Sequence, residues 1–221
     1  MGFVERLNRG ALRKVVEDIR EHVSVKKTDI SDHLETIFTE CLDIEAKLIV
    51  ELGVGDGEST FVFERLAKLW GAVLVSVDVE DCRRVSSYKQ RKFVRQDDIA
   101  FAATFDQWCR NKRIDPQIDI LFIDTSHLYD HTVSEIGSWF PLLAERAKVL
   151  FHDTNMHEVF TRKDGSKGQG WDNERGVIRA IEDYFGGPFN EEKDFIESRN
   201  GWIIKHYSYC NGFMIMDRYG R

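Results

Sequence analysis

The stretch LIVELGVGDGEST, residues 48–60, decides the fold that we expect for this chain. A short apolar run leads to Glu51, and three glycines then alternate with other residues over positions 53–57. Ser59 and Thr60 follow and begin a new apolar pattern with helical spacing. A buried strand, a glycine-rich turn and a helix in this order are typical of the first unit of an open α/β sheet, in which a ligand lies against the turn.

Two classes of ligand suit such a turn, because its glycines let the backbone approach closely and the following helix offers free N–H groups. A dinucleotide-binding turn follows the pattern G-x-G-x-x-G, whereas this chain has G-x-G-x-G and Glu58 at the third position. A carboxylate there would repel a pyrophosphate. S-adenosylmethionine carries no phosphate, and its ammonium and sulfonium groups suit the acid before the glycines, Glu51.

Acids also end the next two apolar runs. Asp78 closes the run AVLVSVD, where it can accept both ribose hydroxyls of that cofactor. Asp97 closes the run FVRQD and can accept from the adenine amino group, with Asp98 as its substitute. Because the carboxyl ends of parallel strands meet at one edge of a sheet, we expect these acids to surround one pocket.

Composition restricts the partners. The chain has 221 residues and a formal net charge of −7, which argues against a nucleic acid held through its phosphates. The four cysteines form no C-x-x-C pair and are expected to be reduced thiols. We see no signal peptide and no apolar stretch long enough to span a bilayer, so we expect a cytoplasmic protein without a membrane partner.

Apolar periodicity alternates between helix and strand along the chain. We expect helices at about 3–23, 31–43, 61–70, 98–108, 134–146 (with a kink or restart at Pro141) and 175–185, and strands at 47–52, 72–78, 93–97, 119–124, 147–153, 202–208 and 212–218. The segment 162–170, RKDGSKGQG, is expected to be a mobile loop.

This alternation predicts an α/β protein with a doubly wound, mostly parallel sheet of seven strands. The last two strands are expected to form an antiparallel hairpin at one edge. We divide the chain into an N-terminal helical cap, 1–45, and a ligand-binding domain, 46–221. The helical cap is expected either to cover the pocket of a second substrate, the acceptor, or to form the contact of a homodimer.

Four motifs in order, VELGVGDGES, SVD ending at Asp78, RQDD at 95–98 and ILFIDTSH ending at His127, resemble the class I S-adenosylmethionine-dependent methyltransferases. The resemblance covers about residues 45–155. It implies a Rossmann-like fold and makes 46–221 the methyltransferase domain. The residues that we assign to the cofactor are Glu51, Gly53, Gly55, Gly57, Ser59, Asp78, Asp97, Asp98 and Asp124.

The later stretch FIDTSHLYDHTVSEIGSWFPLLAERAKVLFHDT is similar to small-molecule O-methyltransferases related to cephalosporin-hydroxylase-like proteins, and to the macrolide-sugar and aminocoumarin O-methyltransferases. Many of these bind a divalent metal through an acid that ends the fourth strand and an acidic pair that ends the fifth. The matching positions are Asp124, His152 and Asp153, and His152 departs from the usual Asp or Glu. Oxygen ligands suit Mg²⁺, whereas a histidine favours Mn²⁺, Fe²⁺ or Zn²⁺ or leaves the site vacant.

A hydroxyl that attacks a methyl sulfonium must lose its proton, and a histidine titrates in the right range to take it. His127 lies three residues after Asp124, an offset at which plant-type metal-dependent O-methyltransferases carry a basic residue. His131 and His157 are competitors for this role. His152 is the second candidate base if no metal binds.

The leading hypothesis is therefore an S-adenosylmethionine-dependent O-methyltransferase that acts, with Mg²⁺ or Mn²⁺, on a hydroxyl of a small molecule such as a natural-product sugar. A metal-independent enzyme with a histidine base is the alternative within this class. A dinucleotide-binding oxidoreductase and a cofactor-binding protein without catalysis are the alternatives outside it. The segment 155–174 either covers the acceptor or takes no part.

Overall fold

A computed structural model describes residues 9–218 of the chain. Its strands are β1 (Leu48–Leu52), β2 (Val73–Asp78), β3 (Arg91–Arg95), β4 (Ile118–Ile123), β5 (Leu143–His152), β6 (Val159–Thr161), β7 (Lys167–Gln169), β8 (Phe195–Arg199), β9 (Trp202–Tyr207) and β10 (Phe213–Arg218). Its helices are α1 (Arg9–Val25), α2 (Leu34–Cys41), α3 (Glu58–Trp70), α4 (Asp98–Ala102), α5 (Phe105–Lys112), α6 (Tyr129–Trp139) and α7 (Gly176–Phe185), with short 3₁₀ turns η2 (Ser31–His33), η3 (Arg83–Val85) and η4 (Phe140–Leu142).

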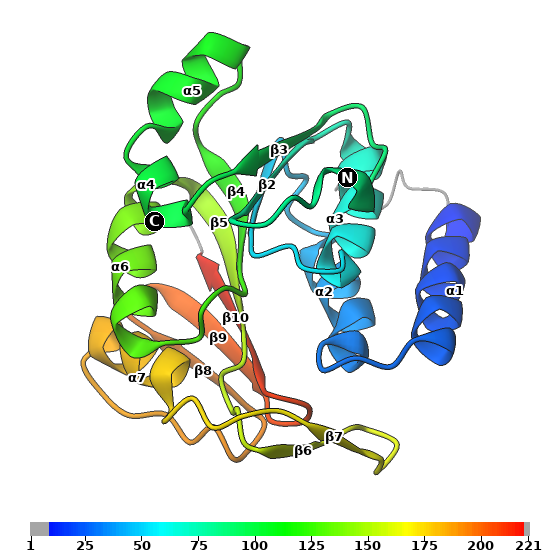
Figure 1. The fold of residues 1–221 in the computed structure, drawn as a ribbon, viewed down its shortest axis with the longest axis vertical. Helices are drawn as coiled ribbons and strands as arrows, with labels where there is room; N and C mark the ends of the chain where they lie inside the picture. The colour runs from blue at the N-terminus through cyan, green and yellow to red at the C-terminus, as the bar shows by residue number, and fades with distance from the viewer. Residues whose placement is uncertain (1–8, 219–221) are drawn as a thin grey trace.

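One sheet of eight strands runs through the molecule in the order β3-β2-β1-β4-β5-β10-β9-β8 (Figure 1). The five strands from β3 to β5 are parallel, and β10, β9 and β8 continue the sheet with antiparallel pairing. The α/β class, the doubly wound parallel part and the antiparallel C-terminal strands are thus confirmed. The carboxyl ends of the parallel strands share one edge, where ligands bind in such sheets.

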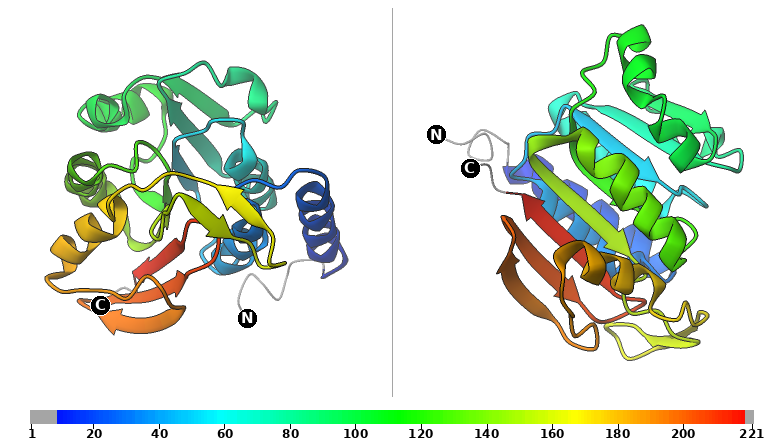
Figure 2. Two further views of the ribbon diagram at one scale, coloured as in Figure 1. Left: turned by 60° about the horizontal axis from the view of Figure 1, so that its bottom comes forward. Right: turned by 90° about the vertical axis from the view of Figure 1, so that its left-hand side faces the viewer.

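Helices cover both faces of this sheet (Figures 1 and 2). Helices α1, α2 and α3 lie on one face, where Phe38 and Phe63 are fully buried against Ile49 of β1. Helices α4 to α7 lie on the other face, where Phe105 and Trp139 are fully buried. Strands β1, β2 and β4 are largely buried between these two layers of helices, which is why they are the short apolar runs from which buried parallel strands are predicted.

Four local expectations were wrong. The sheet has eight strands among the described residues, because β8 pairs with β9 beyond the expected hairpin. The helix expected at 134–146 ends at Trp139, and Leu143 begins β5 by pairing with Ile118 of β4. The segment 162–170 is not a loop throughout, because after the turn at 162–166 it contains β7, which pairs with β6 in a hairpin. Strand β3 spans Arg91–Arg95, two residues earlier than expected.

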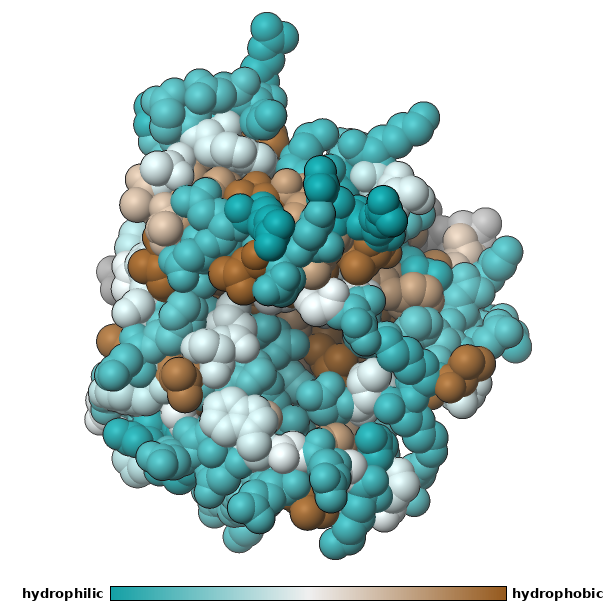
Figure 3. Space-filling view, viewed as in Figure 1, coloured by the Kyte–Doolittle hydropathy of each residue, from teal (hydrophilic) through white to brown (hydrophobic). Residues whose placement is uncertain are grey.

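The described part of the first expected helix is α1, and positions 3–8 lie outside the described residues. No helix within residues 9–218 is long and apolar enough to cross a membrane. The face shown in Figure 3 is largely hydrophilic, with apolar side chains in small separate patches.

Candidate active site

A cavity of about 640 Å³ opens at the carboxyl ends of β1, β2, β3 and β4. Its walls come from the loops that follow these strands and from the segment between α1 and η2. The lining residues are Thr28, Asp29, Ile30, Gly53, Val54, Gly55, Asp56, Glu58, Ser59, Val77, Asp78, Val79, Gln96, Asp97, Asp98, Asp124, Thr125, Ser126, His127 and His131. The structure thus brings the glycine loop and the predicted strand-end acids to one pocket.

Two glycines are required in the loop for different reasons. Gly53 has φ +81°, and a Cβ built on it would lie 1.7 Å from the carbonyl oxygen of Asp124. The loops after β1 and β4 therefore touch through their backbones. Gly57 has φ +87°, and its Cβ would lie 2.8 Å from Cβ of Val85. Gly57 does not line the cavity, so its role is to let η3 pack against the loop, whereas Gly55 and Ser59 do line it.

Glu51 does not face the ligand, contrary to the prediction. Its side chain is fully buried between β1 and α3, outside the cavity lining. Hydroxyl groups of Ser59, Thr60 and Ser76 donate to its carboxylate over 2.6–2.9 Å. Burial raises the pKa of Glu51, while these hydrogen bonds and the charge of Arg91 lower it. Glu51 therefore holds the first turn of α3 against β1 through the hydroxyl groups of Ser59 and Thr60.

Asp78 reaches the cavity from the end of β2. Its Oδ2 accepts the N–H groups of Val54 at 2.8 Å and Gly55 at 3.1 Å, and its Oδ1 accepts the N–H of Glu80 at 2.8 Å. Burial raises the pKa of Asp78, but these hydrogen bonds lower it below its ordinary value. The side chain is thus an ionised acceptor that also fixes the glycine loop.

Asp97 and Asp98 follow β3 and have different surroundings. The Oδ1 of Asp97 accepts the N–H of Ala100 at 2.8 Å and so caps α4, while the rest of this exposed side chain faces the cavity. Asp98 is buried, and its Oδ1 lies 3.0 Å from Nε2 of His131. Burial raises the pKa of Asp98, against the opposing charge of His131.

The N-terminal segment contacts the glycine loop through Glu58, the first residue of α3. Lys26 Nζ lies 2.8 Å from one of its oxygens and His22 Nε2 lies 2.8 Å from the other. The N-terminus of α3, where a pyrophosphate would bind in a dinucleotide site, is thus already beside a carboxylate with basic partners.

Two carboxylates and two imidazoles gather where β4 and β5 end. His127 Nε2 lies 3.2 Å from Asp124 Oδ1 and 3.0 Å from Asp153 Oδ2. His152 Nδ1 lies 3.4 Å from Asp124 Oδ1 and 3.2 Å from Asp153 Oδ2. His152 and Asp153 are buried, while Asp124 and His127 reach the cavity. We call these four residues the strand-end cluster.

The charges of this cluster change the expected state of His127. Burial lowers the pKa of His127, but its hydrogen bonds to Asp124 and Asp153 raise it to about 10. Burial likewise lowers the pKa of His152, while the charges of Asp153 and Asp124 raise it well above 6.5. In the ion-free protein, two imidazolium ions therefore balance two carboxylates near neutral pH.

The strand-end cluster fits a divalent cation. One ligand atom from each of Asp124, His152 and Asp153 lies within 4.8 Å of the others, the spacing of a metal site. Within residues 9–218, the buried atom Asp153 Oδ1 has no hydrogen-bond partner. A divalent ion also carries the charge of the two protons that it would displace.

The other two histidine candidates, His131 and His157, lie outside the strand-end cluster. His157 is outside the cavity lining, and its Nε2 contacts Asn155 at 3.1 Å and Glu192 at 3.2 Å. His131 lines the cavity but faces Asp98. Trp171 reaches the site from the segment 155–174, with its ring stacked 6.1 Å from that of His127.

Two acids that surround the site, Asp29 and Glu135, are not marked by any pattern in the sequence. Asp29 lines the cavity from the segment after α1 and lies within electrostatic reach of Asp124 and Asp153. Glu135 is fully buried on α6 beside Asp98 and His131. An acid at a helix start or on a helix face is so common that neither position stands out before the fold is known.

Comparison with known proteins places this site in context. Residues 50–154 match the family model of a methyltransferase domain. One stretch of 44 residues is 39% identical to an uncharacterized protein of Sinorhizobium fredii and covers 20% of this chain and 5% of that protein. The chain thus aligns with only a small part of the length of this curated relative.

Solved structures share the fold over most of the chain. O-methyltransferase TomG of Streptomyces achromogenes, involved in tomaymycin synthesis and solved with SAM, has TM-score 0.59 and 15% identity, covering 97% of this chain and 92% of that one. A candidate caffeoyl-CoA O-methyltransferase of Staphylococcus aureus has TM-score 0.57 and 17% identity, covering 92% of each chain. MycE of the mycinamycin pathway, solved with Mg and SAH, has TM-score 0.56 and 18% identity, covering 92% of this chain and 54% of MycE.

Proposed function

Residues 50–154 match the model of a methyltransferase domain and the fold is shared with solved O-methyltransferases, and from this premise we propose that the chain transfers the methyl group of S-adenosylmethionine to a hydroxyl of a small molecule, with a divalent metal ion at the acceptor. The observation that carries the proposal is the position of the strand-end cluster. It lies at the end of a glycine-lined cavity that also receives acids from the ends of β2, β3 and β4.

The cavity offers a matching group for each part of the cofactor. Backbone from Gly53 to Gly55 lies beside the methionine part, Asp78 accepts the ribose hydroxyls, and Asp97 accepts the adenine amino group, since Asp98 is turned toward His131. This order directs the methyl group toward Asp124 and His127, because the glycine loop and Asp124 touch at Gly53. A dinucleotide in the same cavity is disfavoured because Glu58 occupies the position of the third glycine of the dinucleotide-binding pattern.

The reaction that we assign is a direct substitution. The acceptor oxygen attacks the methyl carbon, the carbon–sulfur bond breaks with its electron pair left on sulfur, and the hydroxyl proton passes to the imidazole ring of His127. Asp124, His152 and Asp153 would hold the metal ion, which would lower the pKa of the acceptor hydroxyl. Since Asp124 and Asp153 also hold the ring of His127, the same two carboxylates position the base.

The direct test is product formation. The purified protein, S-adenosylmethionine and Mg²⁺ or Mn²⁺ are incubated with a panel of hydroxylated small molecules, sugars and phenols among them, and adenosylhomocysteine and methylated product are both measured. Acceptor-dependent formation of both products is expected. Binding of NAD instead of the adenosyl cofactor would support an oxidoreductase, and cofactor binding without turnover on any acceptor would support the non-catalytic alternative.

A variant of Asp78 tests the cofactor position. Losing the charge-assisted hydrogen bonds to the ribose costs about 1.5–3 kcal/mol, so Asp78→Ala should bind S-adenosylmethionine at least about tenfold more weakly in calorimetry. Asp81→Ala is the matched control, because Asp81 is an exposed acid on the same loop that pairs with Arg83 outside the main cavity. Thermal unfolding checks that both variants fold. Unchanged affinity in Asp78→Ala would refute the ribose assignment.

A further inference from the structure

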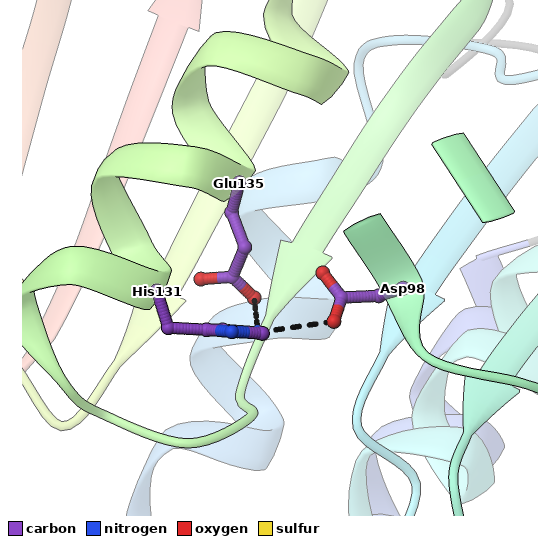
Figure 4. A group of neighbouring side chains, drawn as sticks. All are labelled: Asp98, His131 and Glu135. Atoms are coloured by element: carbon purple, nitrogen blue, oxygen red, sulfur yellow. Dashed lines mark hydrogen bonds and ion pairs between the residues drawn. The ribbon is translucent and has the colours of Figure 1, made fainter. Parts of the chain in front are cut away.

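A second group of acids and imidazole lies in the wall of the main cavity, apart from the strand-end cluster (Figure 4). Asp98 is the first residue of α4, and His131 and Glu135 lie one turn apart on α6. His131 Nε2 lies 3.0 Å from Asp98 Oδ1 and 3.7 Å from Glu135 Oε1. Asp98 and His131 line the cavity, and Glu135 lies behind them.

The distances are those of ligands around one small ion. Metal–ligand bonds of about 2.0–2.1 Å in a tetrahedral site set neighbouring ligand atoms about 3.3 Å apart. The two distances from His131 Nε2 lie on either side of this value, and all three ligand atoms lie within 4.8 Å of one another. Residues four apart on a helix share one face, so α6 presents His131 and Glu135 together toward Asp98.

Both carboxylates have an oxygen that lacks a partner. Within residues 9–218, Asp98 Oδ2 and Glu135 Oε2 are buried and accept no hydrogen bond. The side chain of Glu135 is 0% exposed, and its other oxygen accepts from Thr125 Oγ1 at 2.6 Å. Over the same residues, His131 supplies the sole basic group within 4.0 Å of either acid. A buried carboxylate oxygen without a partner is costly, so the group calls for a further positive centre.

We propose that Asp98, His131 and Glu135 bind a divalent transition-metal ion, separately from the strand-end cluster. An imidazole with two carboxylates favours Zn²⁺, Mn²⁺ or Fe²⁺ over Mg²⁺. The ion joins α4 to α6 and completes the cavity wall beside the loop that ends β3. It supports the fold at that wall and takes no part in methyl transfer, so this proposal does not depend on the proposed reaction.

The test counts ions in a protein whose strand-end cluster has been disabled. Metal-free Asp124→Asn/Asp153→Asn protein is dialysed against low micromolar Zn²⁺, and bound zinc is measured by mass spectrometry. One equivalent is expected. Adding Glu135→Gln should remove it, whereas adding Asp130→Asn, which removes an exposed carboxylate from the same helix, should leave it in place. No bound zinc in the Asp124→Asn/Asp153→Asn protein would overturn the proposal, as would a full equivalent after Glu135→Gln.

A second measurement keeps the test valid if the combined variants fold poorly. Co²⁺ is titrated into the wild-type protein and into Glu135→Gln alone, and the visible absorption of the bound ion is recorded. The wild type should bind one equivalent more than Glu135→Gln, and Zn²⁺ should displace it. Identical titrations would show that the two carboxyl groups are neutralised by protons alone, which contradicts the proposal.

Discussion

Asp153→Asn and Asp124→Asn are each expected to abolish methyl transfer, with a loss of about a thousandfold or more in kcat. A bound divalent ion contributes several kcal/mol to the stabilisation of developing charge, and each tenfold in rate corresponds to about 1.4 kcal/mol. Asp153→Asn is a sharp test because Asp153 has φ +58°, a left-handed conformation that asparagine adopts readily. The substitution removes the charge and leaves the backbone unstrained.

The accompanying measurements separate this loss from unfolding. Affinity for S-adenosylmethionine should change by less than about threefold, because the proposed contacts with its methionine part, ribose and adenine lie on the loops after β1, β2 and β3. A chelator should inhibit methyl transfer by the wild type, and added Mg²⁺ or Mn²⁺ should restore this activity. Asp164→Asn, which changes an exposed acid paired with Lys27, is the control. Full activity in the chelator would exclude the metal-assisted reaction and favour the metal-independent alternative.

Replacing His127 is expected to lower kcat at least about a hundredfold, since a positioned base contributes about 10²–10⁴-fold. His127 has φ +60°, a conformation that asparagine adopts readily, so His127→Asn removes the imidazole without straining the backbone. His127→Ala removes the ring by simple truncation of the side chain. Both should bind the cofactor with nearly unchanged affinity. If both keep most of the rate while His152→Ala does not, His152 is the base.

The pH dependence carries a second signature. In the ion-free protein the pKa of His127 is about 10, so the ring is protonated at neutral pH and cannot accept a proton. A cation bound by Asp124 and Asp153 would oppose that positive charge and lower the pKa of His127. We therefore expect kcat at saturating metal to rise with pH in the wild type and both His127 variants to lose this rising limb.

The main fold was predictable from the sequence because it depends on local patterns. Buried parallel strands are short apolar runs, and the turn over 53–57 marks the first strand end unambiguously. The stretch 143–146 misled the prediction because its residues suit a helix. These residues form a strand because Leu143 pairs with Ile118 of β4. That contact joins positions far apart in the sequence, so local patterns do not predict it.

The site was less predictable, because it depends on the direction and partners of single side chains. Glu51 stands at the end of an apolar run, but strand alternation points it toward α3, where three hydroxyl groups hold it. The contact of Asp98 with His131 and Glu135 depends on the packing of α4 against α6, which no spacing in the sequence encodes. The strand-end acids were found because the topology alone brings them together.

The three glycine positions of the turn differ in the substitutions that they can tolerate during evolution. Position 53 is closed to every other residue, because a Cβ would overlap the Asp124 carbonyl, and position 57 is closed by Val85. Nothing lies within 4 Å of a Cβ at position 55, whose φ of +49° suits asparagine or aspartate. Saturation mutagenesis with selection for soluble protein should therefore retain Asn and Asp at position 55 and reject them at position 53.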